Sequence, residues 1–307
     1  MPSNQTPLGA LPARFRRLRV LIVGCGDVGL RVARALPTRV RVLALTSSPD
    51  RLSALRAARI VPLLGNLDEP RTLARLAGLA QRVIHLAPPA AEPHDGWRDL
   101  RTQALLHALR LRAVPMSLVY ASTSGVYGDC AGERVAETRS VAPRTPRAQR
   151  RVDAERQVRV FGRAAGTRVA ILRVPGIYAS DREGGTPRER LLRGTPVLVR
   201  EDDVYTNHIH ADDLARIVLA AMWRAAPQRV VHASDHSMLK MGDYFDLAAD
   251  LYGLARPPRI TRAEAQERLP ATMLSFMGES RRLDNTRLRR ELRVRLRHPT
   301  VASGLAA

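Results

Sequence analysis

The feature that most constrains this chain is a short apolar run that leads directly into a glycine-rich turn. Residues 20–23 read VLIV, and the turn Gly24-Cys25-Gly26-Asp27-Val28-Gly29 follows before a helical pattern begins. In a strand–turn–helix unit, the three glycines allow a tight turn, close approach of a pyrophosphate and close packing of helix on strand. The free N–H groups at the helix start favour an anion. All six residues of the turn are therefore predicted to bind a dinucleotide, and Cys25 is expected to fill space rather than to act as a nucleophile.

Strand and helix patterns alternate over the first half of the chain. Apolar runs at residues 19–23, 40–45, 60–64, 82–86, 117–121 and 169–173 predict strands, and helical patterns lie between them. Continuous apolar strands that alternate with helices indicate a parallel sheet covered on both faces. The sequence therefore predicts an α/β fold, with a Rossmann-type doubly wound parallel sheet over residues 18–175. We expect residues 1–17 to be a disordered tail and residues 176–307 to form a smaller, mostly helical substrate lobe packed on the sheet.

The net charge is unusual, but its composition argues against a nucleic-acid partner. The chain has 50 Lys+Arg against 29 Asp+Glu, a formal charge of +21 that would normally suggest a polyanion. Yet Lys240 is the single lysine, and a phosphate-binding surface has no physical reason to avoid lysine. Aromatic residues, on which bases would stack, make up only 4% of the chain. A general preference for arginine accounts for the charge more simply, and we expect a small-molecule substrate.

Cysteine usage and hydropathy bear on the compartment. The two cysteines, Cys25 and Cys130, exclude a disulfide scaffold and a Cys-rich zinc site. No apolar run approaches the roughly 18–20 residues that span a bilayer, and the first residues lack the apolar core of a signal peptide. We therefore expect a cytoplasmic protein with no membrane association.

The end of the second predicted strand bears on the choice of dinucleotide. A site specific for NAD would place Asp or Glu about 20 residues after the glycine turn, where it binds the ribose hydroxyls. This chain has Thr46, Ser47 and Ser48 there, with Arg51 about one helical turn later. Hydroxyls and a guanidinium suit a 2′-phosphate, so NADP is favoured over NAD. The alternative is that Arg51 is an ordinary solvated arginine.

Several segments, taken in order, resemble a known family. Residues 120–129, YASTSGVYGD, resemble the fifth-strand active-site motif of the extended short-chain dehydrogenases/reductases, the group of nucleotide-sugar epimerases and dehydratases. Residues 65–68, 85–88, 172–178 and 207–214 resemble further segments of that group, so the resemblance spans roughly residues 18–300. It implies additional cofactor contacts from Asn66, Leu67, Ala87, Pro88, Val174 and Pro175.

One departure from the family pattern affects the expected chemistry. The family's catalytic pair is Tyr-x-x-x-Lys, in which Tyr is the general acid/base. At the matching positions this chain has Arg147 and Arg151. Arginine stays protonated near neutral pH and cannot serve as a base. Arg151 is still expected to bind the cofactor ribose, but the proton-transfer step lacks its usual carrier.

Other hydroxyl groups of the fifth-strand motif could replace the missing carrier. Tyr127 is the leading substitute proton donor, and Thr123 or Ser122 would bind a substrate hydroxyl or carbonyl. The alternative for Tyr127 is an aromatic side chain that only lines the pocket. His208 and His210, with Asp212 and Asp213, could suggest a metal site. Their position at a helix start favours capping instead, and we expect no metal.

Two functions from different classes remain open at this point. The first is an NAD(P)-dependent oxidoreductase, epimerase or dehydratase that acts on a hydroxyl or carbonyl carbon of a small polar, sugar-nucleotide-like substrate. The alternative is a non-catalytic NADP(H)-binding regulatory or scaffold protein, which the missing Tyr/Lys pair favours. The family resemblance also implies a homodimer packed through long helices.

Overall fold

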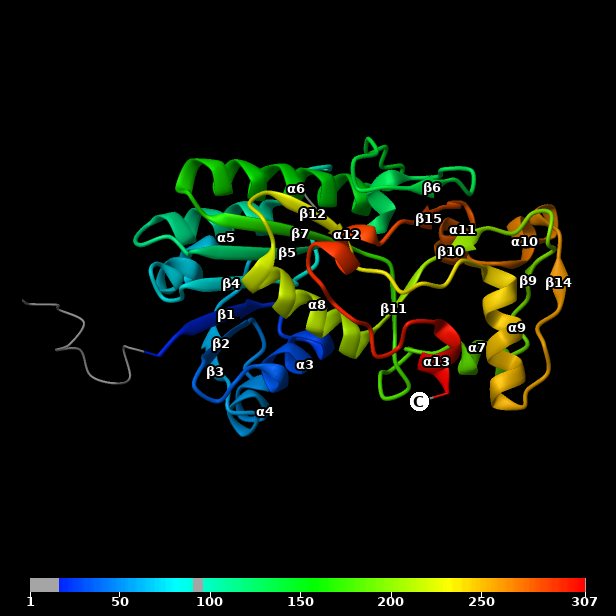
Figure 1. The fold of residues 1–307 in the computed structure, drawn as a ribbon, viewed down its shortest axis with the longest axis horizontal. Coiled ribbons are helices and arrows are strands. Elements are labelled where there is room, and N and C mark those ends of the chain that lie inside the picture. Colours follow the sequence, from blue (N-terminus) through cyan, green and yellow to red (C-terminus); the bar gives the residue numbers. More distant parts are fainter. Residues whose placement is uncertain (1–16, 91–95, 307) are drawn as a thin grey trace, which may run out of the picture.

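A seven-stranded parallel sheet forms the centre of the molecule (Figure 1). The computed structural model describes residues 17–90 and 96–306, and the predicted tail at residues 1–16 lies outside them. The strand order is β12-β7-β5-β4-β1-β2-β3, and every neighbouring pair is parallel. The strands are β1 (Arg19–Val23), β2 (Arg41–Thr46), β3 (Val61–Leu64), β4 (Arg82–His85), β5 (Ser117–Thr123), β7 (Arg168–Val174) and β12 (Arg229–His232). The predicted α/β, doubly wound parallel sheet is confirmed.

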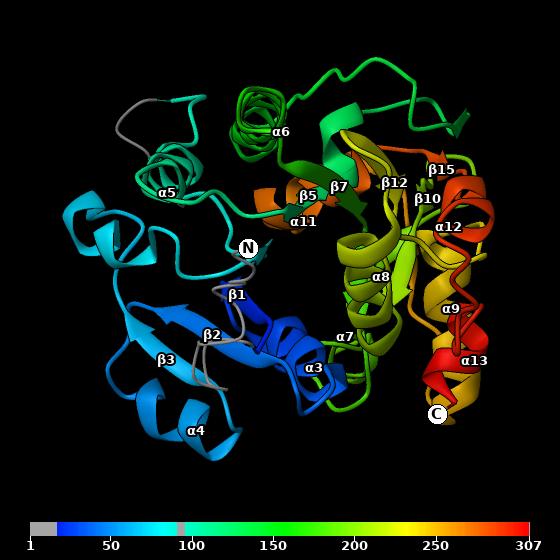
Figure 2. The same ribbon diagram turned by 60° about the vertical axis from the view of Figure 1, so that its left-hand side comes forward.

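Helices cover both faces of this sheet (Figure 2). One face carries α3 (Asp27–Ala35), α4 (Arg51–Ala57) and α8 (Ala211–Arg224). The other carries the 3-10 helix η1 (Pro70–Leu76), α5 (Leu100–Arg110) and α6 (Pro146–Ala165). Because neighbouring strand residues point to opposite faces, Val20 and Ile22 of β1 enter one core while Leu21 and Val23 enter the other. All four are fully buried, which explains why the strand is apolar without alternation.

The parallel arrangement brings the carboxyl ends of the strands to one edge of the sheet. The glycine turn follows β1 there, and the 3-10 helix η2 (Ser124–Tyr127) follows β5. Ligands of open α/β sheets bind in the crevice outside this edge. The fold therefore gathers the predicted cofactor and substrate residues, which are far apart in sequence, at one place.

The C-terminal part of the chain contributes to two regions. A separate core forms around Tyr178, Tyr244 and Phe245, beyond the carboxyl ends of the sheet strands (Figure 1). However, α8 packs against α3, and β12 pairs with β7 in the main sheet. The division at residue 175 stays a prediction. Although α8 and β12 follow residue 175 in the chain, α8 lies in the helix layer beside α3 and β12 lies in the main sheet. The remaining elements are β6 (Arg134–Val135), β8 (Gly176–Tyr178), α7 (Arg188–Leu192), β9 (Val197–Leu198), β10 (Tyr205–Thr206), β11 (His208–His210), β13 (Leu239–Lys240), α9 (Met241–Tyr252), β14 (Arg259–Ile260), α10 (Arg262–Arg268), α11 (Ala271–Met277), β15 (Arg282–Leu283), α12 (Thr286–Arg290) and α13 (Val301–Leu305).

Hydropathy along the helices bears on membrane association. Among the described residues, no helix combines the length and the apolar character needed to cross a bilayer.

The two-sided core predicts a stability difference between buried and exposed aliphatic side chains. Ile84 of β4 is fully buried in the core beneath α3 and α8. We expect Ile84→Ala to lower the free energy of unfolding by about 2–5 kcal/mol, because transfer energy and cavity cost add. Leu111, which is 52% exposed after α5, is the control, and Leu111→Ala should change stability by about 0.5 kcal/mol or less. Urea unfolding followed by circular dichroism measures both, and equal losses would contradict the two-sided core.

Candidate functional site

The glycine turn has the geometry that a bound pyrophosphate requires. Gly24 has a φ of +83°, and a Cβ there would lie 2.4 Å from the backbone nitrogen of Ala87, so only glycine fits. A Cβ on Gly26, by contrast, would meet no atom within 4 Å. Asp27 begins α3, whose first turn has no side-chain cap. The open space at Gly26 therefore faces free helix N–H groups, and the turn fits the phosphates of a dinucleotide.

The other turn residues complete this arrangement. Gly29 packs closely, since its Cβ would lie 3.3 Å from the Cys25 sulfur and from Ile22. Val28 is half-buried beside the core under α3. Cys25 is buried, and burial raises the pKa of its thiol to about 11. A thiol with that pKa stays protonated at neutral pH, as the space-filling interpretation of Cys25 requires.

The carboxylate of Asp27 lies close to the expected phosphates, but two arginines neutralise it. Arg31 binds Asp27 at 3.0 Å and reaches Asp181 and Asp212 at 2.5 Å each. Arg182 binds the second oxygen of Asp27 at 3.0 Å. The three carboxylates raise the pKa of the Arg31 guanidinium against the opposing effect of its burial. This network fixes the first turn of α3 to the segment after β8 and to α8.

The residues after β2 lie beside the same turn. The Arg51 guanidinium donates a hydrogen bond to the carbonyl oxygen of Cys25 at 2.6 Å. Thr46 is buried, and its hydroxyl oxygen accepts from the backbone N–H of Ser48 at 3.2 Å. Ser47 is exposed. The structure therefore brings Arg51 and this short turn to the position where the adenosine ribose of a dinucleotide would lie.

Two further predicted segments are tied to each other. Two nitrogens of the Arg101 guanidinium, Nε and Nη2, donate to the two oxygens of the Asp68 carboxylate at 2.7 and 2.5 Å. The third nitrogen donates to the carbonyl oxygen of Pro88 at 3.3 Å. Asn66 and Leu67 precede Asp68 and are half-buried, and Ala87 packs against Gly24. The loops after β3 and β4 are thus held side by side at the edge of the sheet.

The hydroxyl groups of the β5 motif differ in their availability. Ser122 is buried and donates to the Glu155 carboxylate at 2.6 Å. Thr123 is half-buried, and its hydroxyl oxygen accepts from the backbone N–H of Gly125 at 3.2 Å. The Thr123 proton has no acceptor within the described residues. Thr123 is therefore the member of the pair that can still donate to a substrate oxygen.

Tyr127 lies in a closed polar network. The carbonyl oxygen of Asp284 accepts from Nδ1 of His232 at 2.8 Å, so Nε2 of the neutral ring is an acceptor. The Tyr127 hydroxyl donates to this Nε2 and accepts from Arg173, both at 2.6 Å. Burial raises the pKa of Tyr127 to about 12, with Arg173 opposing it, and lowers that of His232 to about 4. With its proton and a lone pair engaged, Tyr127 touches no open space, which is a reason against its direct role as proton donor; that role stays a prediction.

Arg147 and Arg151 occupy different environments. Arg147 is exposed in the first turn of α6. Arg151 is buried and donates to the carbonyl oxygen of Ala121 at 2.5 Å and to the Tyr120 hydroxyl at 3.2 Å. Arg151 thus fastens α6 to the carboxyl end of β5. Val174 and Pro175 end the neighbouring strand β7 at the same edge.

The structure also reveals residues to which the sequence analysis assigned no role. Arg173 and Glu155 form a buried ion pair at 2.8 Å, and Glu137 accepts from the backbone N–H of His232 at 3.1 Å. Arg173 lies within residues 172–178, which carry the family resemblance, and that is the signal that could have found it. Glu155 lies in none of the segments that carry the resemblance. Nothing in the sequence pattern indicates that they meet.

The metal candidates from the sequence are partly brought together. His210, Asp212 and His298 offer ligand atoms within 4.8 Å of one another, whereas His208 and Asp213 do not join them. His210 Nδ1 already accepts from the Asp212 backbone N–H at 3.2 Å, as a helix cap does. Asp212 also binds Arg31, whose charge opposes a cation there. We propose no metal at this cluster.

Comparison with known proteins gives consistent results. The family described as "NAD dependent epimerase/dehydratase family" matches residues 20–233. No curated protein sequence matches the chain.

Similar solved structures cover nearly the whole chain. A conserved protein of unknown function from Silicibacter pomeroyi has 28% identity and a TM-score of 0.78 over 94% of this chain and 96% of that one. UDP-glucose 4-epimerase from Thermotoga maritima, solved with UDP-glucose, has 19% identity and a TM-score of 0.77 over 94% and 96%. UDP-glucuronic acid 4-epimerase from Bacillus cereus, solved with NAD, has 17% identity and a TM-score of 0.74 over 94% and 97%.

The open space at Gly26 predicts how a dinucleotide site would be lost. We expect Gly26→Asp to abolish NAD(H) and NADP(H) binding, because a carboxylate would stand where the pyrophosphate must lie. Ala164→Asp is the control, because Ala164 is exposed near the end of α6, away from the turn, and the change adds the same carboxylate. Isothermal titration calorimetry measures both variants. Undiminished affinity in Gly26→Asp would overturn the assignment of this turn.

Proposed function

Because the chain belongs to the NAD-dependent epimerase/dehydratase family, we propose that it is an enzyme acting on a hydroxyl or carbonyl carbon of a sugar-nucleotide-like substrate. The observation that carries the proposal is the shared sheet edge. The open glycine turn follows β1, and Thr123, whose hydroxyl proton has no acceptor among the described residues, is the last residue of β5. In the sheet order, β4 alone lies between these two strands. A cofactor on the turn and a substrate at Thr123 would therefore lie in the same crevice.

The proposed substrate class rests on the structural neighbours. One of them is a UDP-glucose 4-epimerase solved with UDP-glucose. Another is a UDP-glucuronic acid 4-epimerase solved with NAD. Their identity to this chain is below 20%, so they support the class of substrate and leave the particular sugar open.

Thr123, Arg151 and Ser122 would have different roles in the proposed reaction. A bound nicotinamide cofactor supplies the acceptor or donor of a hydride. Thr123 would donate a hydrogen bond to the substrate oxygen, and Arg151 would keep a fixed positive charge at the carboxyl end of β5. Positive charge placed where an alkoxide develops favours its formation. Ser122, through Glu155, would hold the strand end in position rather than touch the substrate.

The absence of the usual tyrosine and lysine supports a second candidate function. Arg147 cannot accept a proton and is exposed. A non-catalytic NADP(H)-binding regulatory or scaffold protein would keep the glycine turn and lose turnover. Incubation with cofactor and a panel of sugar nucleotides and carbonyl compounds separates the two, because turnover on any member excludes the non-catalytic function.

The assembly and compartment are also part of the proposal. We propose a homodimer paired through the long helices of the sheet face, with α5, whose Leu100 is 42% exposed, in the contact and Arg156 and Arg163 of α6 outside it. Light scattering coupled to size-exclusion chromatography tests it.

Two buried free cysteines are in keeping with a reducing, cytoplasmic location.

Thr123 is expected to matter for turnover and not for cofactor binding. We expect Thr123→Val to lower kcat by roughly 100-fold, the effect of losing one hydrogen bond to a developing oxyanion, with cofactor affinity unchanged. Thr38→Val, at an exposed threonine before β2, is the control and should retain full activity. Steady-state kinetics of product formation, followed by chromatography of the sugar nucleotide, measures both.

The same assay tests Tyr127. Tyr127→Phe removes the hydroxyl that lies between Arg173 and His232. Loss of kcat with unchanged thermal stability would support its predicted role as proton donor. Retained turnover would refute that role and leave Thr123 as the hydroxyl that contacts the substrate.

Arg51 is expected to favour NADP over NAD. Arg51→Ala should weaken NADP(H) binding about tenfold or more, the value of a charge-assisted hydrogen bond, and leave NAD(H) affinity nearly unchanged. Arg56→Ala is the matched control, because Arg56 is exposed on the same helix and its loss removes the same charge. Calorimetry with both cofactors measures the ratio, and an equal loss for NAD would contradict recognition of the 2′-phosphate.

A further inference from the structure

A second polar cavity lies away from the glycine turn, between α6, β12, α12 and the segment that follows β6. Its volume is about 550 Å³, within the range of small-molecule sites. Seven arginines and two glutamates line it. Arg139 and Arg229 also pair with Glu133 and Glu291, which lie outside the lining, so three positive charges remain in excess. None of the residues assigned above to the cofactor contributes to its lining.

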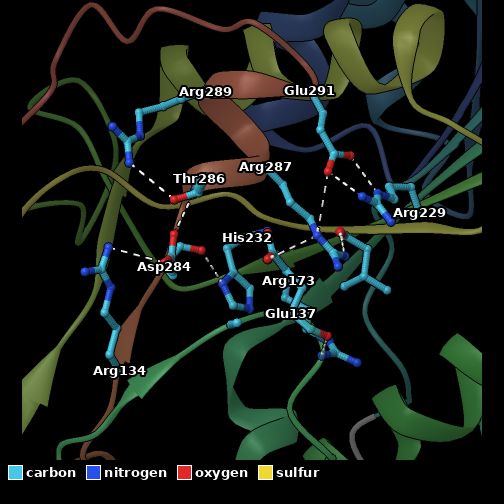
Figure 3. Close-up of polar contacts among 12 residues, drawn as sticks. Arg134, Glu137, Arg173, Arg229, His232, Asp284, Thr286, Arg287, Arg289 and Glu291 are labelled. Carbon is cyan, nitrogen blue, oxygen red and sulfur yellow. Dashed lines mark hydrogen bonds and ion pairs between the residues drawn. The ribbon is translucent and has the colours of Figure 1, made fainter.

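The floor of the cavity is made of buried ion pairs. The carboxylate of Glu155 binds Arg173 at 2.8 Å, and both side chains are at most 5% exposed. Glu137 is buried as well and lies 3.5 Å from Arg287, which Figure 3 shows between Glu137 and Glu291. The carboxylates of Glu155 and Glu137 thus pair with Arg173 and Arg287. They contribute little negative charge to balance the other arginines of the cavity.

The wall formed by α6 carries the excess charge. Arg156, Arg159 and Arg163 line the cavity from one helix face, over eight residues and a rise of about 10 Å along the helix. Arg159 shares Glu155 at 3.5 Å. Among residues 17–90 and 96–306, no carboxylate pairs with Arg156 or Arg163, and both are exposed at the cavity mouth. Two unpaired guanidinium groups two turns apart match an anion that carries several charges.

We propose that this cavity binds a multiply charged phosphate compound through its phosphate groups. Guanidinium groups bind phosphate oxygens bidentately, and the spacing along α6 suits two or three linked phosphates rather than one. The residues that line the cavity include no aromatic side chain. Recognition therefore rests on the phosphates and not on stacking of a nucleobase.

Titration calorimetry of the full-length protein with sodium tripolyphosphate tests the proposal, at constant ionic strength. With the glycine turn blocked by Gly26→Asp, we expect one site per chain. Adding the double change Arg156→Gln/Arg163→Gln should lower the affinity of that site at least about tenfold. These exposed side chains have no partner carboxylate among the described residues, so the variant should fold. The matched control is Arg56→Gln/Arg75→Gln, two exposed arginines elsewhere with the same loss of charge, and its affinity should change less than twofold.

Further measurements distinguish this cavity from the cofactor turn, from a general effect of net charge and from a nucleic-acid surface. Gly26→Asp should bind tripolyphosphate as well as the wild type, because the cofactor turn is a different site; a parallel loss there would overturn the proposal. Equal weakening in the double variant and the control would reduce the effect to net charge and overturn it too. Citrate binding as tightly as tripolyphosphate would refute the phosphate class. Stronger competition by a short duplex DNA than by pyrophosphate would assign the surface to nucleic acid instead.

Discussion

The buried ion pair between Glu155 of α6 and Arg173 of β7 is the interaction on which the arrangement of the site depends. Two charges that are nearly inaccessible to water are stable only when their remaining hydrogen bonds are satisfied. Ser122 completes the shell of Glu155, and Tyr127 completes that of Arg173. One pair therefore fixes β5, η2, α6 and β7 against each other. Glu155 and Arg173 also line the arginine-rich cavity. The same ion pair therefore contributes both to the packing of the β5 motif and to that cavity.

The features predicted correctly from the sequence are those that local pattern encodes. Residues 20–23 are apolar without alternation because both faces of β1 are covered, and that pattern is typical of a parallel sheet. The glycine turn is equally predictable, because Gly24 is the residue that the backbone requires there and Gly26 leaves open space beside the helix start. Such signals span ten residues or fewer and need no knowledge of the remaining chain.

The contacts that the sequence did not reveal join charged residues far apart in the chain. Arg31 meets Asp181 and Asp212 across 150 and 181 positions, and no periodicity marks them as partners. The sequence favours Tyr127 as a substitute proton donor, with an aromatic side chain that only lines the pocket as the alternative. In the structure its hydroxyl bonds His232, a residue 105 positions away, and nothing in the sequence indicates that contact. Burial of polar groups depends on which distant partner arrives, and that is a property of the assembled fold.

The net charge of +21 acquires meaning only when it is divided by environment. Arg31 and Arg173 are buried and paired with carboxylates, and their charges are neutralised within the fold. Arg151 is buried without a carboxylate partner among the described residues, and one nitrogen of its guanidinium donates both to the carbonyl oxygen of Ala121 and to the Tyr120 hydroxyl. Arg151 therefore holds α6 against the carboxyl end of β5 at the position where the family resemblance implies a lysine, and the shape of the crevice does not depend on that lysine.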